Sequence, residues 1–180
     1  MAPKPLPTLQ ELLDRCLKIN ASFEIADAGP HGLGLFATSP ILRFQEITPY
    51  GGTLADCCSA TLSPKTHYAR IPNSDWAVDG LPVRQALRRQ PDGTYAFQAL
   101  VSLDVLGFGA IANSAPRATA NAKVVWTAFR AQGDDAGDWY CLGVGNQKAG
   151  VLTAIRDIAI GEQIRWHYQV ILPDGTKISP

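Results

Sequence analysis

The sequence predicts a mainly β domain with short helices. From about residue 23 the chain consists of short runs rich in β-branched and aromatic residues, and Gly, Pro and Asn interrupt these runs at close intervals. Strands do not alternate with long helices, which argues against a Rossmann-type cofactor site. With 180 residues, 46% of them hydrophobic and 18% charged, the chain fits one domain with ample material for a core.

The clearest predicted helix covers residues 8–19, TLQELLDRCLKI. Thr8 and Glu11 have the spacing of a capping box, and an apolar stripe at helical spacing predicts that this helix packs on the domain. The strands expected after it are, in chain order, FEIADA (23–28), GLFAT (34–38), FQEIT (44–48), a THYARI–WAVDG hairpin around PNSD (72–75), YAFQALVSL (95–103), AKVVWTAFRA (122–131) partnered with DWYCLGVG (138–145), and GVLTAIRDI (150–158) and QIRWHYQVI (163–171) on either side of AIGE.

Composition excludes several classes of function. Lys plus Arg and Asp plus Glu both number 16, so the chain lacks the charge of a general nucleic-acid binder. The basic run VRQALRRQPDG (83–93) is better explained as a solvated helix face or loop. The four cysteines and three histidines are scattered, so no metal site is expected. No stretch has the length of a membrane span or the apolar core of a signal peptide. We therefore expect an intracellular protein, cytoplasmic or nuclear, that does not bind membranes.

Four stretches contain candidate functional residues. In HGLGLF, Gly32 and Gly34 let the backbone approach a ligand, although most such pairs are only turns. In ITPYGG, Tyr50 could line a pocket or be a half-buried core residue. Asn113 and Asn121 lie in a run of small residues, where an Asn could hold a ligand that carries an amine and a carboxylate or could staple its own turn.

The fourth stretch, IAIGEQIRWHY, ends in two aromatic residues. By period-two alternation Trp166 and Tyr168 would share one face of a strand, and His167 would face the other way. Taken together and in order, GLGLFAT, PYGG, IANSAPRATANAKVV and GEQIRWHY resemble the four motifs of the SET-domain family of protein lysine methyltransferases. The segment YARIPNSDWAVDG also resembles one that bacterial and viral members carry. The resemblance spans about residues 23–168.

The resemblance implies a SET-domain β-clip architecture: several small sheets with a pseudoknot, plus an N-terminal helix. It divides the chain into a helical appendage (1–22), a catalytic domain (23–169) and a closing segment (170–180). It implies S-adenosylmethionine as cofactor and a protein substrate with an exposed lysine, histone or non-histone. The cofactor-binding residues would be Gly32, Leu33, Gly34, Asn113 and Ser114.

By the same resemblance Tyr168 is the catalytic tyrosine, and Tyr50 is catalytic and lines the lysine channel together with Trp166. Asn121 would hold the pseudoknot together. Ser114 stands where the family has a histidine, which bears on cofactor affinity. The absence of cysteine-rich flanking segments is compatible with a homodimer that closes the channel. The alternative is a SET-like domain that no longer methylates protein: a binding module, or a pocket recruited to a small amine or another small-molecule reaction. A plain β-rich interaction domain is the remaining alternative.

Overall fold

The computed structural model describes residues 22–56, 68–71, 76–89, 91, 95–97, 107–128, 148–167, 170–171 and 177–178. The predicted helix over 8–19 lies outside these residues, as does Tyr168. The described elements, in order, are β1 (Phe23–Asp27), η1 (Gly29–His31), β2 (Leu33–Ala37), β3 (Glu46–Pro49), β4 (Thr53–Asp56), β5 (Tyr68–Arg70), β6 (Trp76–Asp79), α2 (Leu81–Ala86), β7 (Leu87–Arg89), β8 (Tyr95–Phe97), η2 (Gly109–Ile111), β9 (Asn113–Ser114), β10 (Ala122–Ala128), β11 (Lys148–Ala154), β12 (Gln163–Trp166), β13 (Val170–Ile171) and β14 (Lys177–Ile178).

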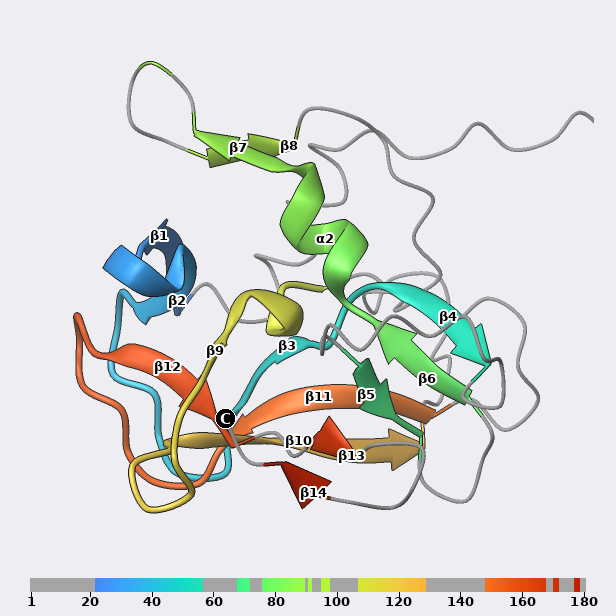
Figure 1. Cartoon of the computed structure of the whole chain (residues 1–180). Coiled ribbons are helices and arrows are strands. Elements are labelled where there is room, and N and C mark those ends of the chain that lie inside the picture. The colour runs from blue at the N-terminus through green and yellow to red at the C-terminus, as the bar shows by residue number, and fades with distance from the viewer. Residues whose placement is uncertain are drawn as a thin grey trace, which may run out of the picture.

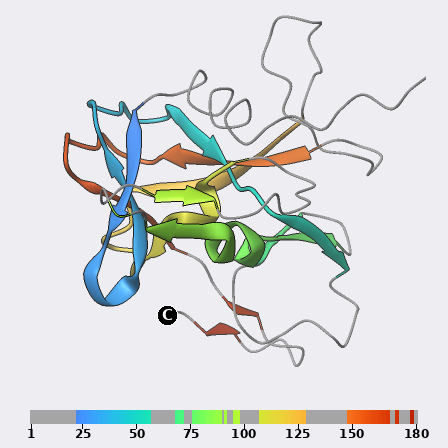
Figure 2. The ribbon, with the colours of Figure 1, turned by 90° about the horizontal axis from the view of Figure 1, so that it is seen from above.

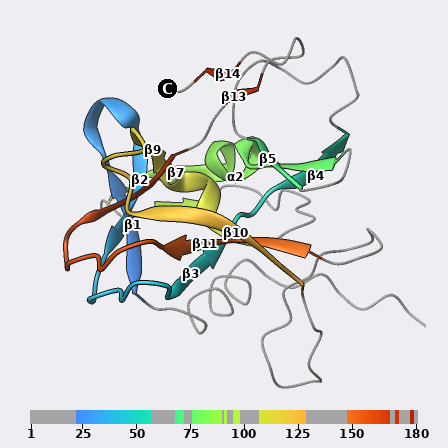
Figure 3. The same ribbon diagram turned by 90° about the horizontal axis from the view of Figure 1, so that it is seen from below.

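The mainly β prediction is confirmed at this level: the described residues form several sheets and a single short α-helix (Figure 1). The largest sheet is mixed and has seven strands, six of them in the order β1-β2-β12-β10-β11-β3, with β9 paired to β12. A three-stranded antiparallel sheet has the order β4-β6-β5, and β7–β8 and β13–β14 form two small hairpin sheets. Figure 3 shows β3, β10 and β11 side by side, with β1 and β2 at one end and β4 and β5 at the other.

The predicted hairpin around residues 72–75 is confirmed, and the first two predicted strands also form a hairpin. β1 and β2 pair antiparallel from Phe23↔Ala37 to Asp27↔Leu33, and the connection between them uses Gly29 and Gly32 at φ values of 65° and 72°. These values lie in the left-handed region, where glycine carries no steric penalty. β5 and β6 also pair antiparallel, on either side of residues 72–75.

The predicted partner of the strand that begins at 122, residues 138–145, lies outside the described residues. Among the described strands, β10 pairs along its whole length with β11, from Ala122↔Ala154 to Ala128↔Lys148. Gly150 permits this pairing, because a Cβ there would lie 2.9 Å from the Val124 side chain and 3.1 Å from the Trp126 ring. A residue without a side chain therefore lets β11 pass close beneath these two bulky groups.

β12 lies inside the large sheet and pairs with three other strands. It pairs antiparallel with β2 through Gln163↔Phe36 and Ile164↔Leu35, and parallel with both β9 (Trp166↔Ser114) and β10 (Ala122↔Trp166). The loop 115–121 thus leaves β12 at β9 and returns to it at β10. The chain makes this return through a tight turn, in which the Thr119 amide donates to Pro116 O at 2.9 Å.

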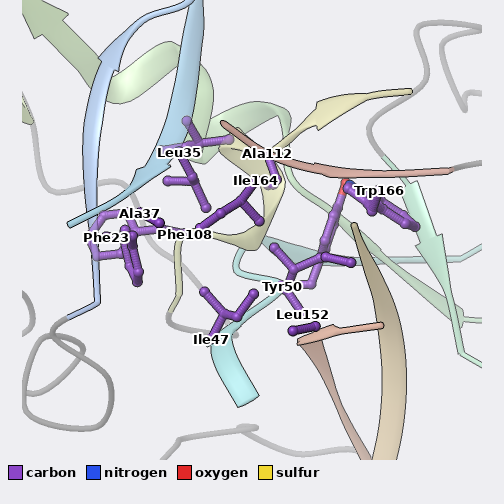
Figure 4. Close-up of a cluster of buried hydrophobic side chains, with 14 of the residues drawn as sticks. Phe23, Leu35, Ala37, Ile47, Tyr50, Phe108, Ala112, Leu152, Ile164 and Trp166 are labelled. Atoms are coloured by element: carbon purple, nitrogen blue, oxygen red, sulfur yellow. The ribbon is translucent and has the colours of Figure 1, made fainter. Parts of the chain in front are cut away.

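The core lies between this sheet, η2 and α2, and Figure 4 shows its central side chains. Leu35, Ile111, Leu152 and Ile164 are fully buried. Helix α2 contributes buried Val83, and it lies across the face of the sheet near β7 in the view from above (Figure 2). Burial of each large aliphatic side chain stabilises the fold by roughly 1.5–3 kcal/mol, so this core fixes the relative positions of β2, β9 and β12.

Candidate functional site

Segment 32–34 lies where β2 passes β9. A Cβ on Gly34 would stand 2.7 Å from Gln163 Nε2 and 3.1 Å from Asn113 Nδ2, so only glycine fits without displacing one of these amides. Leu33, in contrast, presents its carbonyl oxygen to polar groups from two other segments. The predicted Gly-Leu-Gly segment is thus a point of close approach.

Asn113 is buried, with 6% of its surface exposed, and it is brought to segment 32–34 by the pairing of β9 with β12. Its Nδ2 donates to Leu33 O at 3.0 Å. The predicted association of these residues is therefore observed, although they lie 80 positions apart in the sequence.

Arg84 is a site residue that the sequence patterns do not reveal. It projects from α2, and its Nη2 donates both to Asn113 Oδ1 at 3.2 Å and to Leu33 O at 3.3 Å. Its Nη1 donates to Ala110 O at 2.9 Å and to Ile111 O at 3.2 Å. The interpretation of run 83–93 as a solvated surface is therefore wrong for Arg84. Because these four acceptors are distant in sequence and three of them are backbone carbonyls, no local motif identifies it.

Two further polar atoms on β12 and β9 are buried without a hydrogen-bond partner in the described part of the chain: Gln163 Nε2, which lies with Asn113 Nδ2 around Gly34, and Ser114 Oγ, on the residue after Asn113. A buried donor left unsatisfied costs roughly 1–3 kcal/mol. Such atoms are expected where a bound molecule or ordered water completes the arrangement.

Tyr50 lies at the end of β3, where it is 2% exposed. Its ring meets that of Trp166 edge to face, with centroids 5.6 Å apart and planes at 74°, and Figure 4 shows Tyr50 extending toward Trp166. Glycines make room for this pair: a Cβ on Gly80 would lie 3.1 Å from the Tyr50 hydroxyl oxygen. Gly51 similarly abuts the backbone of Gly107.

Asn121 ties the end of loop 115–121 to β12. It is fully buried, its Nδ2 donates to Gln163 O at 2.8 Å and to Glu162 Oε1 at 3.0 Å, and its Oδ1 accepts from the Arg165 amide at 2.7 Å. The Asn121 backbone amide also donates to Arg165 O at 3.0 Å. One side chain therefore replaces a stretch of sheet pairing between β10 and β12.

Glu162 contacts both the buried Asn121 side chain and the half-exposed Arg156 side chain. A hydrogen bond from Arg156 lowers the pKa of Glu162 from its ordinary value of 4.5 to about 2, burial opposes the shift, and the bond from Asn121 adds to it. The same bond between the two side chains raises the pKa of Arg156. Glu162 is therefore ionised at neutral pH and supports the position of Asn121.

Of the remaining predicted residues, Tyr168 lies outside the described residues. His167, which precedes it, has Nδ1 3.2 Å from Ala115 O, so this imidazole contacts loop 115–121. Among the described residues, no three His, Cys, Asp or Glu side chains gather in a way that could hold a metal ion. Nor does any helix in that part of the chain have the length and apolarity to cross a membrane.

No protein-family model matches this chain, and a search of curated proteins finds no relative. Evidence for function therefore comes from the geometry of the residues themselves.

Proposed function

We propose that this protein is an S-adenosylmethionine-dependent protein lysine methyltransferase of the SET-domain kind. The observation that carries the proposal is that three separated motifs converge on β12, which belongs to the fourth. Asn113 contacts Leu33, Gly34 lies beside Gln163 and Asn113, and Tyr50 packs on Trp166 at the end of the same strand. The order of motifs suggests the family, and their proximity is what a shared site requires.

The topology supports the finer fold assignment. β12 has β9 and β10 as parallel partners, and loop 115–121 connects these two partners around it. A strand enclosed in this way is the arrangement expected of the pseudoknot, with Asn121 as the residue that holds it. The small residues of the loop, among them buried Ala115 and Ala120, suit such crowding.

The residues present fit the amino-acid end of the proposed cofactor. Leu33 O and Asn113 Oδ1 are acceptors suited to an ammonium group, and Gln163 Nε2 and Ser114 Oγ are buried atoms able to donate to a carboxylate. Gly34 leaves open, beside Gln163 Nε2 and the Asn113 side chain, the space that a Cβ would fill. When bound, S-adenosylmethionine supplies an electrophilic methyl group on a sulfonium.

The protein's own residues would orient the lysine amine and exclude water. Tyr50 and Trp166 form a buried aromatic surface that favours the uncharged form of a lysine amine, whose pKa is ordinarily about 10.4. Tyr168 would orient that amine through its hydroxyl. Orientation of this kind contributes at most roughly 7–11 kcal/mol to lowering a barrier. The substrate would be an exposed lysine of an intracellular protein, and a homodimer could close the site.

The first test is calorimetric titration of the protein with S-adenosylmethionine. The second incubates the protein and S-adenosylmethionine with a lysine-rich protein mixture and detects methylated lysines by mass spectrometry. Asn113→Ala should weaken binding by about tenfold or more because an acceptor is lost. Tyr168→Phe should keep binding and lose most methyl transfer. Tyr95→Phe is the matched control, because Tyr95 lies in none of the four motifs that carry the proposal. Unchanged transfer by Tyr168→Phe would refute the catalytic assignment.

A second candidate is a SET-like binding module that does not methylate protein. The observation in its favour is that Asn113 Oδ1 and Leu33 O already accept hydrogen bonds from Arg84. Tight binding of S-adenosylmethionine without methyl transfer to any protein by the wild-type chain would favour this candidate.

A further inference from the structure

The acceptor pair in the candidate site already holds a cation. Leu33 O and Asn113 Oδ1 converge on one nitrogen, Arg84 Nη2, at 3.3 Å and 3.2 Å. Two oxygen acceptors directed at a single cationic nitrogen are also what an α-ammonium group requires. The guanidinium and a bound amino-acid end would therefore compete for the same two oxygens.

The opposite side of the guanidinium is also engaged. Nη1 donates to Ala110 O and Ile111 O, so each terminal nitrogen contacts two acceptors and their fork is not directed toward an incoming carboxylate. This geometry indicates that the Arg84 guanidinium occupies the position of a ligand ammonium group and does not bind a ligand carboxylate.

Helix α2 fixes Arg84 in this position. Val83 is fully buried and Ala86 is 7% exposed, so the backbone on both sides of Arg84 is packed into the core. A Cβ on Gly80 would overlap Ala110, which shows how closely the start of α2 approaches η2. The contact is therefore part of the fold, and Nη2 can leave its two acceptors only when the whole guanidinium moves by rotation about the side-chain bonds.

We propose that Arg84 is an internal competitor for the ammonium group of the ligand, so that binding requires displacement of Nη2 from Leu33 O and Asn113 Oδ1. The inference rests on the proposed function for its ligand. It predicts that Arg84 weakens the binding of ligands that carry the ammonium group and leaves the binding of those without it unaffected. Rotation of the Arg84 side chain would thereby control access to the site.

The experiment compares two adenosine thioethers by calorimetry. S-adenosylhomocysteine keeps the amino-acid end and undergoes no methyl transfer, whereas 5′-methylthioadenosine lacks that end. Arg84→Met should bind S-adenosylhomocysteine at least about tenfold more tightly than the wild type, which corresponds to about 1.4 kcal/mol. Its affinity for 5′-methylthioadenosine should stay unchanged. Arg84→Lys keeps a cation and should stay close to wild type.

The matched control is Arg88→Met, because Arg88 is exposed and donates to carbonyls of its own segment, Gln85 O and Leu87 O. It should change neither affinity. Thermal melting checks the fold of each variant, and Arg84→Gln replaces Arg84→Met if the latter does not fold.

The outcomes separate this inference from the proposed function. Weaker or equal binding of S-adenosylhomocysteine by Arg84→Met, with binding intact in the wild type, overturns the competitor role and leaves the proposed function standing. Binding by Arg84→Met but not by the wild type supports both. Failure of the wild type and of Arg84→Met to bind either thioether refutes both.

Discussion

Replacement of Asn121 by alanine tests the junction between loop 115–121 and β12. The side chain makes three hydrogen bonds, two of them to backbone groups, Gln163 O and the Arg165 amide. Asn121 is fully buried, so neither backbone group gains water when the amide is removed. Each buried group left unsatisfied costs roughly 1–3 kcal/mol. Water can replace the bond to Glu162, whose side chain is 28% exposed.

With two such groups, we expect Asn121→Ala to lower the free energy of unfolding by about 2–6 kcal/mol, a large part of the roughly 5–15 kcal/mol typical of a domain. The assay is urea unfolding followed by tryptophan fluorescence, in which the midpoint should fall by about 2 M at an unchanged slope. Thr119→Ala is the control in the same loop: its hydroxyl is exposed and donates to Pro116 O at 3.2 Å. It should cost less than about 1 kcal/mol. A decrease in unfolding free energy below about 1 kcal/mol for Asn121→Ala would refute the claim that this side chain holds loop 115–121 against β12.

Further predictions concern pH and close backbone contacts. Because the pKa of Glu162 is lowered from 4.5 to about 2, the unfolded chain binds the proton more readily, so this stabilisation is complete above pH 4.5 and is lost as pH falls toward 2. The shift corresponds to at most about 3 kcal/mol, and solvent screening around half-exposed Arg156 reduces it to about 1 kcal/mol. Glu162→Gln should flatten the stability profile across that pH range in urea titrations. Gly51→Ala should cost several kcal/mol, since its Cβ would overlap the backbone of Gly107, whereas Gly161→Ala meets open space and should cost only about 1–2 kcal/mol of backbone strain at φ 76°. Equal melting temperatures for these two glycine variants would contradict the close approach of Gly51 to Gly107.

Local patterns predicted much of the fold. The first two strands, the hairpin around residues 72–75 and the mainly β class all follow from β-branched runs and the Gly, Pro and Asn residues that interrupt them, which act over a few residues. The pairing of β10 with β11 was not predicted this way, because 19 residues of sequence, 129–147, separate the two strands and many alternative registers suit the same alternation.

The candidate site was predictable only in part. Asn113 was expected beside the Gly-Leu-Gly segment because of the family resemblance, and the structure brings Asn113 and Leu33 together. Arg84 could not be predicted, since its bonds to Leu33 O, Ala110 O and Ile111 O depend on how α2 lies over η2. Every residue has a backbone carbonyl, so the sequence does not indicate which carbonyls accept a hydrogen bond from Arg84.

The measurement that tests the proposed cofactor site most directly is a two-dimensional amide NMR titration of the isotopically labelled protein with S-adenosylhomocysteine. We predict that the largest shifts occur at the backbone amides of Gly32, Leu33, Gly34 and Asn113, and at the side-chain amide of Asn113. Saturable shifts confined to these residues and their neighbours on β12 would locate the ligand in the candidate site. Shifts confined to the sheet of β4, β5 and β6, or no shifts at millimolar ligand, would contradict the proposal.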